Sequence, residues 1–471
     1  MSGPSPAAGG GRGGVLALAC LAQFMVILDV AIVNVALPSI QADLAVDQGT
    51  LAWVVIAYGL PLGGCLLLGG RLADLLGRRA VLLTGLLAFT GASALAGAVD
   101  TVGLLIAARA LQGLGAALIP PAALATIAVT FEAGPARNRA FGLFGAVTGI
   151  SASVGVLASG LLSDGLGWRA VFLINVPVGL VLIAMTSRLL ARQGRRRSSA
   201  DLDLLGAATV TGALLLLVLG LSRGAEVGWS SGPSLASLSA AVVLLGCFVV
   251  VEARSQAPLV PAALRRNRSL VTASTAALFA FAALFAFIFL GSLLMQEVFA
   301  YTPTRTGLGW LATTLVSFVA AALTGARLVQ VLGVARLLVA GQLLLAAAAY
   351  LLTRVPSDGA YASDLLPALL LAGVGGGLAA PAAQIGALSQ VAEASTGVAS
   401  GVLETVREIG GVLGVAAVSS VLASAAGPAV DRFHAAYWCV VVCGSVGAAV
   451  AATSYPRALP APTLPLGTAG G

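Results

Sequence analysis

Charged residues are scarce in this chain of 471 residues, and lysine is absent, so all 25 basic residues are arginine. Charged side chains make up 9% of the chain and hydrophobic ones 59%, against roughly 25% and 45–50% in soluble globular proteins. The mean hydropathy is +1.02. Because water cannot solvate a surface of this composition, the sequence predicts a polytopic protein of the lipid bilayer.

Side chains that bind nucleotides and metals are also few. Without lysine there is no G-x-x-x-x-G-K-[ST] phosphate loop, and the single histidine, His434, cannot form an H-E-x-x-H zinc site. The five cysteines lie in apolar stretches without the paired spacing of zinc ligands: Cys20, Cys65, Cys247, Cys439 and Cys443. We therefore expect no metal, no cofactor and no enzymatic activity, with energy drawn from a gradient rather than from bound ATP.

Fourteen apolar stretches are long enough to cross about 30 Å of hydrocarbon as helices. They are residues 15–37, 51–70, 80–98, 102–128, 139–162, 169–188, 204–222, 233–252, 270–295, 306–326, 334–353, 363–384, 396–424 and 434–454. With this count, 18 arginines lie at the termini and in the loops of one side, 5 on the other side and 2 within spans. Arginine gathers on the cytoplasmic side of membrane proteins, so both termini are predicted to be cytoplasmic.

The net charge of +7 also has to be explained. A nucleic-acid-binding surface needs its basic residues on one face, whereas these arginines are scattered through short loops, so we expect no nucleic-acid partner. Arginine without lysine, together with abundant alanine and glycine, suggests a GC-rich bacterial genome. The hypothesis is therefore a multi-pass protein of the bacterial cytoplasmic membrane.

An internal repeat divides the chain into two halves. Residues 71–85 match 327–341 at an offset of 256, and 113–123 match 373–383 at an offset of 260. Two parallel halves are typical of secondary transporters that hold substrate between them near the midplane, although chance similarity in Ala- and Leu-rich sequence is the alternative. The predicted order is a disordered cytoplasmic N-terminus (1–14), an N-terminal six-helix bundle (15–190), a cytoplasmic linker (191–203), two inserted transmembrane helices (204–253), a second cytoplasmic linker (254–267), a C-terminal six-helix bundle (268–455) and a cytoplasmic tail (456–471).

Ionisable residues inside spans are costly and therefore functional candidates. Asp29 in the first span and Arg109 in the fourth both lie about 10–12 Å from the outer membrane surface, at 1.5 Å per residue. Desolvation favours a protonated carboxyl and a nearby arginine favours a charged one, so Asp29 can exchange a proton between conformations. The alternative is a fixed structural ion pair. Gln112 shares the helix face of Arg109, and Asn34 is a less direct candidate for the substrate cavity.

A second group of charges lies near mid-bilayer in the thirteenth span. Glu404 and Glu408 are four residues apart on one helix face with Arg407 beside them. One arginine cannot neutralise two carboxylates, so one acid is predicted to be protonated or to await a cation. We assign Glu404 to proton coupling and Arg407 and Glu408 to the substrate cavity. Self-contained pairing within the span is the alternative.

Two glycine-containing segments are candidates for conformational roles. The loop GRLADLLGRR between the second and third spans is predicted to form a gate at the cytoplasmic mouth, although it can equally serve as a positive-inside anchor. Its candidate residues are Gly70, Asp74, Gly77, Arg78 and Arg79. In the fifth span, glycines allow close helix approach, with packing filler as the alternative: Gly149, Gly155 and Gly160, with Gly145 on the same span.

Taken in order, these motifs resemble the major facilitator superfamily, and specifically its fourteen-span drug:proton antiporters of the EmrB/QacA type. LDVAIVNVALP is similar to the first-span motif, GRLADLLGRR to the loop motif, IAARALQGLG to the fourth-span motif and DGLGWRAVFLINVPVG to the segment entering span six. NRSL before span nine and VREIGGVLGVA in span thirteen also match in character. The resemblance implies an all-α membrane fold of two six-helix bundles with two extra central helices. It further implies that Asp29 couples proton entry to drug exit and that Arg109 tunes that step.

Two positions depart from the family pattern. The fifth-span antiporter motif has Gly-Pro where this chain has Gly155-Val156, which weakens the expectation of antiport. Glu404 stands where the family more often has an amide. The expected function is proton-driven efflux of hydrophobic or cationic drugs by alternating access, from a protein expected to be monomeric. A metabolite symporter or importer of the same fold remains an alternative, as does a non-transporting receptor or channel.

Overall fold

The computed structural model describes residues 9–46, 48–191, 203–255, 258–425 and 427–454, and these residues are almost entirely helical. The first part of the chain forms α1 (Gly9–Leu44), α2 (Gln48–Leu76), α3 (Arg78–Ala96), α4 (Val102–Thr130), α5 (Pro135–Leu166), α6 (Arg169–Leu173) and α7 (Asn175–Leu189). The middle part forms α8 (Leu204–Val227), α9 (Gly232–Arg254) and the short α10 (Ala262–Arg265). The last part forms α11 (Arg268–Leu293), α12 (Pro303–Leu323), α13 (Val329–Leu352), α14 (Leu366–Leu388), α15 (Thr396–Ser424) and α16 (Ala429–Ser454).

Local sequence signals fix several helix ends. Asp203, Asn267 and Thr302 cap α8, α11 and α12 by accepting a backbone N–H three residues ahead, at 2.7, 3.0 and 3.2 Å. These side chains satisfy donors that have no partner inside the helix. Proline occupies the first turn of α5, α9 and α12, where its missing N–H costs nothing.

Single glycines with positive φ break the chain at equivalent points of the two halves. Gly77 (φ 92°) separates α2 from α3, and Gly333 (φ 77°) interrupts the helical path near the start of α13. L side chains rarely adopt this conformation. The two glycines are matched at the repeat offset of 256, so the backbone itself carries the repeat seen in the sequence.

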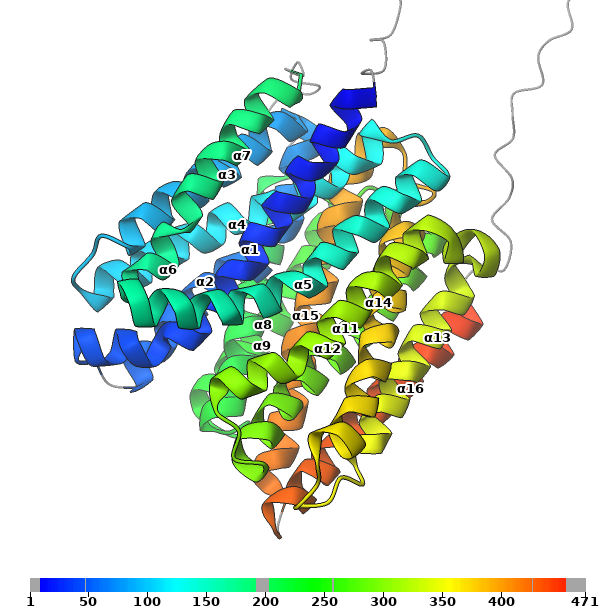
Figure 1. Cartoon of the computed structure of the whole chain (residues 1–471). Coiled ribbons are helices and arrows are strands. Elements are labelled where there is room, and N and C mark those ends of the chain that lie inside the picture. Colours follow the sequence, from blue (N-terminus) through cyan, green and yellow to red (C-terminus); the bar gives the residue numbers. More distant parts are fainter. Residues whose placement is uncertain (1–8, 47, 192–202, 256–257, 426, 455–471) are drawn as a thin grey trace, which may run out of the picture.

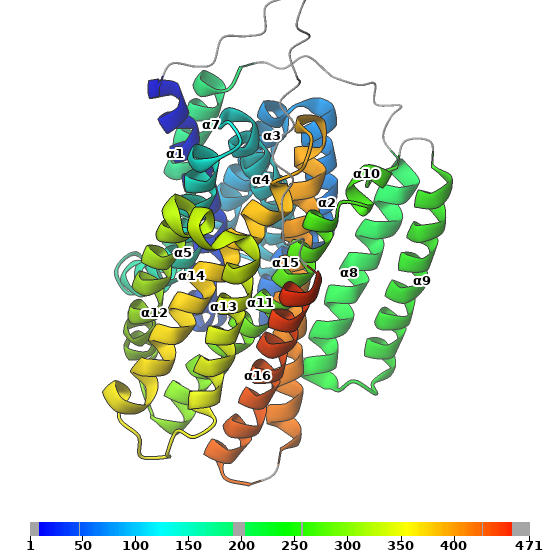
Figure 2. The same cartoon turned by 90° about the vertical axis from the view of Figure 1, so that its right-hand side faces the viewer.

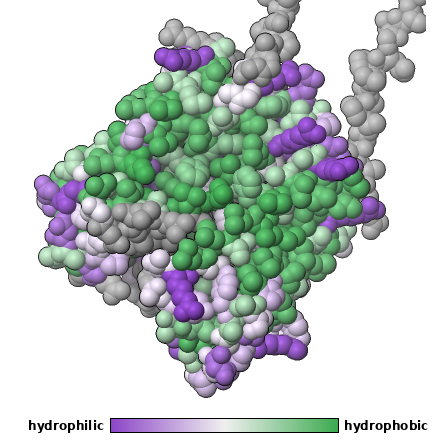
Figure 3. All heavy atoms as spheres, viewed as in Figure 1, coloured by the Kyte–Doolittle hydropathy of each residue, from purple (hydrophilic) through white to green (hydrophobic). Residues whose placement is uncertain are grey.

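Each predicted apolar stretch overlaps a helix, and the helices extend beyond several predicted edges. Among the described residues, eleven helical stretches are long and apolar enough to cross a membrane, and one of these, Thr304–Leu352, contains both α12 and α13. The fourteen-crossing count remains a prediction. Figure 3 shows hydrophobic residues over most of the visible face, with hydrophilic ones gathered mainly toward the two ends. Large exposed side chains such as Leu87, Leu180 and Val242 are therefore placed to contact lipid.

The helices of the two halves pack in the same pattern. In one half α1 packs on α5 and α3 on α4, and in the other α11 packs on α15 and α13 on α14. Contacts between the halves are made chiefly by α2 with α15 and by α5 with α12 (Figure 1). The helix pair α8–α9 lies at one side of this assembly, where α8 packs against both α2 and α15 (Figure 2).

Glycines bring the halves into backbone contact at one end of the molecule. A Cβ atom built on Gly70 of α2 would lie 2.1 Å from the Gly397 carbonyl oxygen of α15. A Cβ built on Gly142 of α5 would lie 2.6 Å from the Cα of Gly325, which follows α12. Gly70 lies near the end of α2 and Gly142 near the start of α5, and these helix ends lie on the side of the molecule where α1 begins (Figure 1). The two halves are therefore closed against each other at that end.

Candidate functional site

Asp29 lies in a fully buried polar network inside the first half. Its side chain on α1 is 0% exposed, and Oδ2 is 2.6 Å from Nη1 of Arg109 on α4. The other oxygen, Oδ1, accepts hydrogen bonds from Gln112 Nε2 at 2.7 Å and Asn175 Nδ2 at 2.8 Å. The predicted proximity of Asp29, Arg109 and Gln112 is present in the structure. The Asp29 side chain therefore accepts three hydrogen bonds, one of them from the cation Arg109.

Arg109 ties this carboxylate to the neighbouring helices. Its Nε donates to the Val54 carbonyl of α2 at 3.0 Å, and its guanidinium carbon lies 4.1 Å from the ring centre of Tyr58. Gln112 also donates to Ser93 of α3 at 2.9 Å. Residues of five helices therefore meet at this ion pair: α1, α2, α3, α4 and α7. Asp29 is thus linked, directly or through Arg109 and Gln112, to four other helices of its half.

Three side chains of this network were not predicted from the sequence: Asn175, Tyr58 and Ser93. Asn175, the first residue of α7, belongs to the quoted stretch DGLGWRAVFLINVPVG, and that motif was the available signal. Tyr58 gave no signal, because an aromatic residue in an apolar span is ordinary core. For Asn34 the surroundings of the side chain lie outside the described residues.

The charges of α15 separate into two environments. Arg407 Nη1 is 2.5 Å from Glu404 Oε1, both side chains are buried, and the guanidinium carbon lies 4.2 Å from the Phe281 ring centre. With its amide nitrogen toward α5, Gln384 donates to the Phe141 carbonyl at 3.3 Å and accepts from Arg407 at 3.1 Å. This network therefore connects α15 and α14 to α5 in the opposite half.

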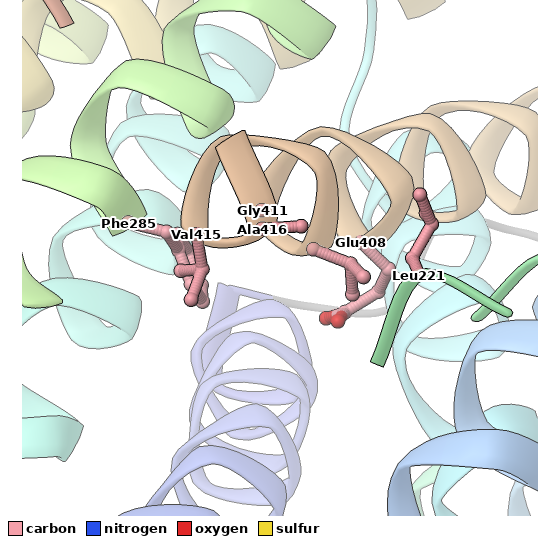
Figure 4. A pocket seen from close by; sticks show the side chains of 7 residues that line it. Leu221, Phe285, Glu408, Gly411, Val415 and Ala416 are labelled. Atoms are coloured by element: carbon pink, nitrogen blue, oxygen red, sulfur yellow. The ribbon is translucent and has the colours of Figure 1, made fainter. Parts of the chain in front are cut away.

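Glu408 is not part of that ion pair. Its carboxylate points into a cavity between α15, α11 and α8 (Figure 4). Arg407 thus pairs with Glu404 and leaves Glu408 facing the cavity, and the expectation that one of the two acids is protonated or awaits a cation stays a prediction.

The predicted gating segment is mostly helical rather than a loop. The second helix continues to Leu76 because the first residue with a non-helical conformation is Gly77. Asp74 accepts the backbone N–H groups of Gly397 and Val398, the first turn of α15, at 2.8 and 2.9 Å. A carboxylate from one half thus occupies a helix N-terminus of the other, where the helix dipole favours negative charge.

Arginines complete this contact between the halves. Arg78 Nη2 donates to the Glu393 carbonyl at 3.3 Å and lies 3.5 Å from the Glu393 carboxylate. Arg79 instead donates to the Ser187 carbonyl of α7 at 3.2 Å, within its own half. The five segment residues therefore have different positions. Gly70 and Asp74 contact α15, and Arg78 contacts Glu393 just before it. Gly77 separates α2 from α3, and Arg79 lies within the first half.

Two of the candidate glycines of the fifth span have described contacts, and that of Gly155 is the closer, since a Cβ built on Gly145 would meet Pro381 of α14 at an ordinary 3.5 Å. A Cβ built on Gly155 would lie 2.7 Å from the Cβ of Ala31 and 3.0 Å from the Leu28 carbonyl of α1. Any side chain would push α5 away from the helix that carries Asp29. The surroundings of Gly149 and Gly160 lie outside the described residues.

Comparisons with known proteins agree with this architecture. The family model of the Major Facilitator Superfamily matches residues 19–415. The chain is 39% identical over 402 residues to the puromycin resistance protein pur8 of Streptomyces alboniger, covering 85% of this chain and 80% of that protein. It is 37% identical over 411 residues to the cephamycin export protein CmcT of Amycolatopsis lactamdurans, covering 87% and 85%.

A solved structure with the same fold is that of the human organic anion transporter MFSD10 (TETRAN). Its TM-score is 0.69 at 16% sequence identity, with 93% of this chain and 99% of that chain covered. At this identity the likeness concerns the fold alone. The family match over most of the chain, supported by relatives above 30% identity, shows that this protein is a multi-pass membrane protein of the Major Facilitator Superfamily.

Proposed function

We propose that this chain exports hydrophobic or cationic drugs, including antibiotics, across the bacterial cytoplasmic membrane in exchange for protons. Alternating access between the two halves performs the export. The observation that carries the proposal is the fully buried Asp29, whose carboxylate is bonded at once to α4 and α7 through Arg109, Gln112 and Asn175.

Protonation of Asp29 is the proposed coupling step. A neutral carboxyl loses its attraction for Arg109, and the proton it gains occupies an oxygen that otherwise accepts a hydrogen bond. The link from α1 to α4 and α7 then weakens, and the first half can change its packing. Removal of the proton restores the ion pair. Because both states need the same buried site, proton binding and the conformation of the half are coupled.

The contact between Asp74 and α15 supports alternation of the two halves. In the described conformation this contact, together with the pairs Gly70–Gly397 and Gly142–Gly325, closes one end of the molecule. We place that end in the cytoplasm, with both termini there, because most arginines of the interhelical segments lie on that side. This orientation makes the described conformation the one closed to the cytoplasm.

The remaining assignments belong to the same proposal. Fourteen helices cross the membrane, namely two six-helix bundles with α8 and α9 inserted between them, and the transporter acts as a monomer. The relatives named for puromycin resistance and cephamycin export favour export over import. Gly155 keeps a close contact with α1 although Val156 replaces the motif proline, which supports the proposal of antiport.

The test is transport in everted membrane vesicles with ethidium as the probe. The wild-type protein should accumulate ethidium when a proton gradient is imposed and should lose it on addition of an uncoupler. Asp29→Asn should reduce this uptake to the level of vesicles without the protein, because the amide cannot exchange a proton. Asp358→Asn, at an exposed position, is the matched control and should behave as wild type. Gradient-driven uptake by inserted Asp29→Asn protein at the wild-type rate would refute the coupling role.

A further inference from the structure

The cavity beside Glu408 lies between a helix of the inserted pair and two helices of the second half. It is lined by Leu221 of α8, Phe285 of α11, and Glu408, Gly411, Val415 and Ala416 of α15 (Figure 4). Its volume is about 260 Å³. Cavities that enclose whole drug-sized molecules measure about 300–1,000 Å³, so this one has room for a small molecule or for one end of a larger one.

Of the described residues that line this cavity, Glu408 alone has an ionisable side chain. Among the described residues, none forms a hydrogen bond or ion pair with it, since its neighbour Arg407 is engaged by Glu404 and by the Phe281 ring. An anionic side chain at membrane depth without a counterion is costly. A cation inside the cavity would remove that cost, and the partly exposed ring of Phe285 offers an aromatic surface that cations favour.

The wall formed by α8 is attached to the same half as the rest of the cavity. At one end of the helix pair, Trp229 Nε1 donates to Ser420 Oγ of α15 at 2.5 Å. At the other end, the buried Glu252 of α9 accepts the N–H groups of Leu259 and Val260, at 3.1 and 2.7 Å, and Leu259 is itself fully buried in the core. These polar bonds hold the pair to α15 and to the segment leading into α11.

Against the first half, by contrast, α8 makes apolar contacts. A Cβ built on Gly64 of α2 would lie 2.8 Å from the Leu215 side chain, and one built on Gly63 would lie 3.5 Å from Val218. Smooth glycine surfaces allow helices to slide past each other more readily than hydrogen-bonded ones. The polar bonds that hold the helix pair are thus made with the second half and the segment leading into it, and the second half also supplies the other walls of the cavity.

We propose that this cavity binds the positively charged end of lipophilic monocations, with Glu408 as the counterion and Leu221 and Phe285 as apolar walls. The inference rests on the proposed export function and names the substrate class that α8 helps to select. The ion pair of Asp29 and Arg109 lies in the other half and does not line this cavity. Glu408 thus sets preference for cations, whereas Asp29 serves every substrate.

The direct test is saturable binding of radiolabelled benzyltrimethylammonium, a permanent and water-soluble cation, to the purified full-length protein in lipid nanodiscs. Glu408→Gln should weaken binding about tenfold or more, because the ion pair between the carboxylate and the quaternary ammonium is lost. Leu221→Trp should weaken it by filling the cavity without changing any charge. Leu205→Trp, at a strongly exposed position on the same helix, should bind as wild type. Asp29→Asn should also bind as wild type.

Efflux then separates the two proposals. The efflux test uses cells in which the wild-type protein confers resistance both to ethidium, a cation, and to chloramphenicol, which is neutral. Cells with Glu408→Gln should lose resistance to ethidium and keep resistance to chloramphenicol. Cells with Asp29→Asn should lose resistance to both. Unchanged benzyltrimethylammonium binding in both Glu408→Gln and Leu221→Trp would overturn the cation site and leave the export function standing. Equal loss of cationic and neutral efflux in Glu408→Gln would also overturn it, since that result assigns Glu408 to proton coupling. Failure of Asp29→Asn to affect efflux would refute the export mechanism without touching the binding result.

Discussion

Gly70 offers the sharpest test of how the two halves close. Replacing it with alanine adds one methyl group, which would lie 2.1 Å from the Gly397 carbonyl oxygen and 2.8 Å from its carbon. Both are backbone atoms, so no side-chain rotation relieves the clash. Since ordinary contacts begin at 3.4 Å, α2 and α15 must separate locally by about 1.3 Å.

The size of the effect follows from the cost of overpacking. An added methyl in a packed interface costs about 1–3 kcal/mol, which corresponds to about a 5–150-fold shift between two conformations. The closed arrangement alone bears that cost, because the clash disappears once α2 and α15 part. Gly70→Ala should therefore favour the conformation open at this end and should slow transport, since the cycle must pass through closure.

Hydrogen–deuterium exchange measures this shift directly. The amides of Gly397 and Val398 are bonded to Asp74 in the closed arrangement, so peptides covering them should exchange faster in Gly70→Ala. Gly59→Ala is the matched control, because it lies on the same helix and a Cβ there meets nothing within 4 Å. Equal exchange in the Gly70 and Gly59 variants would refute the idea that backbone contact limits closure.

Two further predictions concern charges at opposite ends of the molecule. Asp74→Ala should speed hydrogen–deuterium exchange at the first turn of α15 and weaken closure by about 0.5–2 kcal/mol, as for loss of a helix cap. Asp74→Asn should have a smaller effect on exchange, because its amide oxygen still accepts one hydrogen bond. Equal effects of the two variants would contradict the charge argument. Hydrogen bonds from Trp168 and Arg169 hold the pKa of Asp43, beyond the membrane span of α1, below its usual value. Its stabilising contribution is therefore present at neutral pH and lost as the pH falls through that lowered pKa. The melting temperature of Asp43→Asn should lie below that of wild type at neutral pH and converge with it in acid, whereas a constant difference would exclude the linkage.

Hydropathy was sufficient to locate the apolar segments, because each needs a long run of apolar residues whatever its neighbours are. It could not fix their ends. Residues beyond the hydrocarbon are polar, and whether they are helical depends on local signals. Pro135 starts α5 four residues before the predicted start of the fifth span. Gly77 ends α2, whose last residue lies six residues after the predicted end of the second span. For this reason the segment 70–79 was predicted as a loop, whereas it is helical except at Gly77.

Depth in the membrane was enough to bring Asp29 and Arg109 together, since a buried carboxylate and a buried arginine at one level have few other partners. The depth of a residue does not show in which direction around the helix axis its side chain points. The sequence therefore could not show that Asn175 faces Asp29, or that Arg407 turns toward Glu404 and leaves Glu408 to the cavity. That second outcome depends on where α8 packs, which the internal repeat cannot predict because the inserted pair has no counterpart.

The closure between the halves is symmetric in its backbone contacts and asymmetric in its charges. Gly70 contacts Gly397, and Gly142 contacts Gly325. Gly70 and Gly325 are 255 residues apart, as are Gly142 and Gly397. The same close contact is therefore formed twice, each half supplying in one contact what the other half supplies in the other. Yet Asp74 corresponds to Gln330, whose amide donates to the Ala326 carbonyl of its own helix turn. Moreover, Gly397 lies in the first turn of α15, where free amides await an acceptor, whereas Gly142 lies well inside α5. Only one of the two contacts can therefore be latched by a carboxylate, and a variant at Asp74 has no twin on the other side to compensate for it.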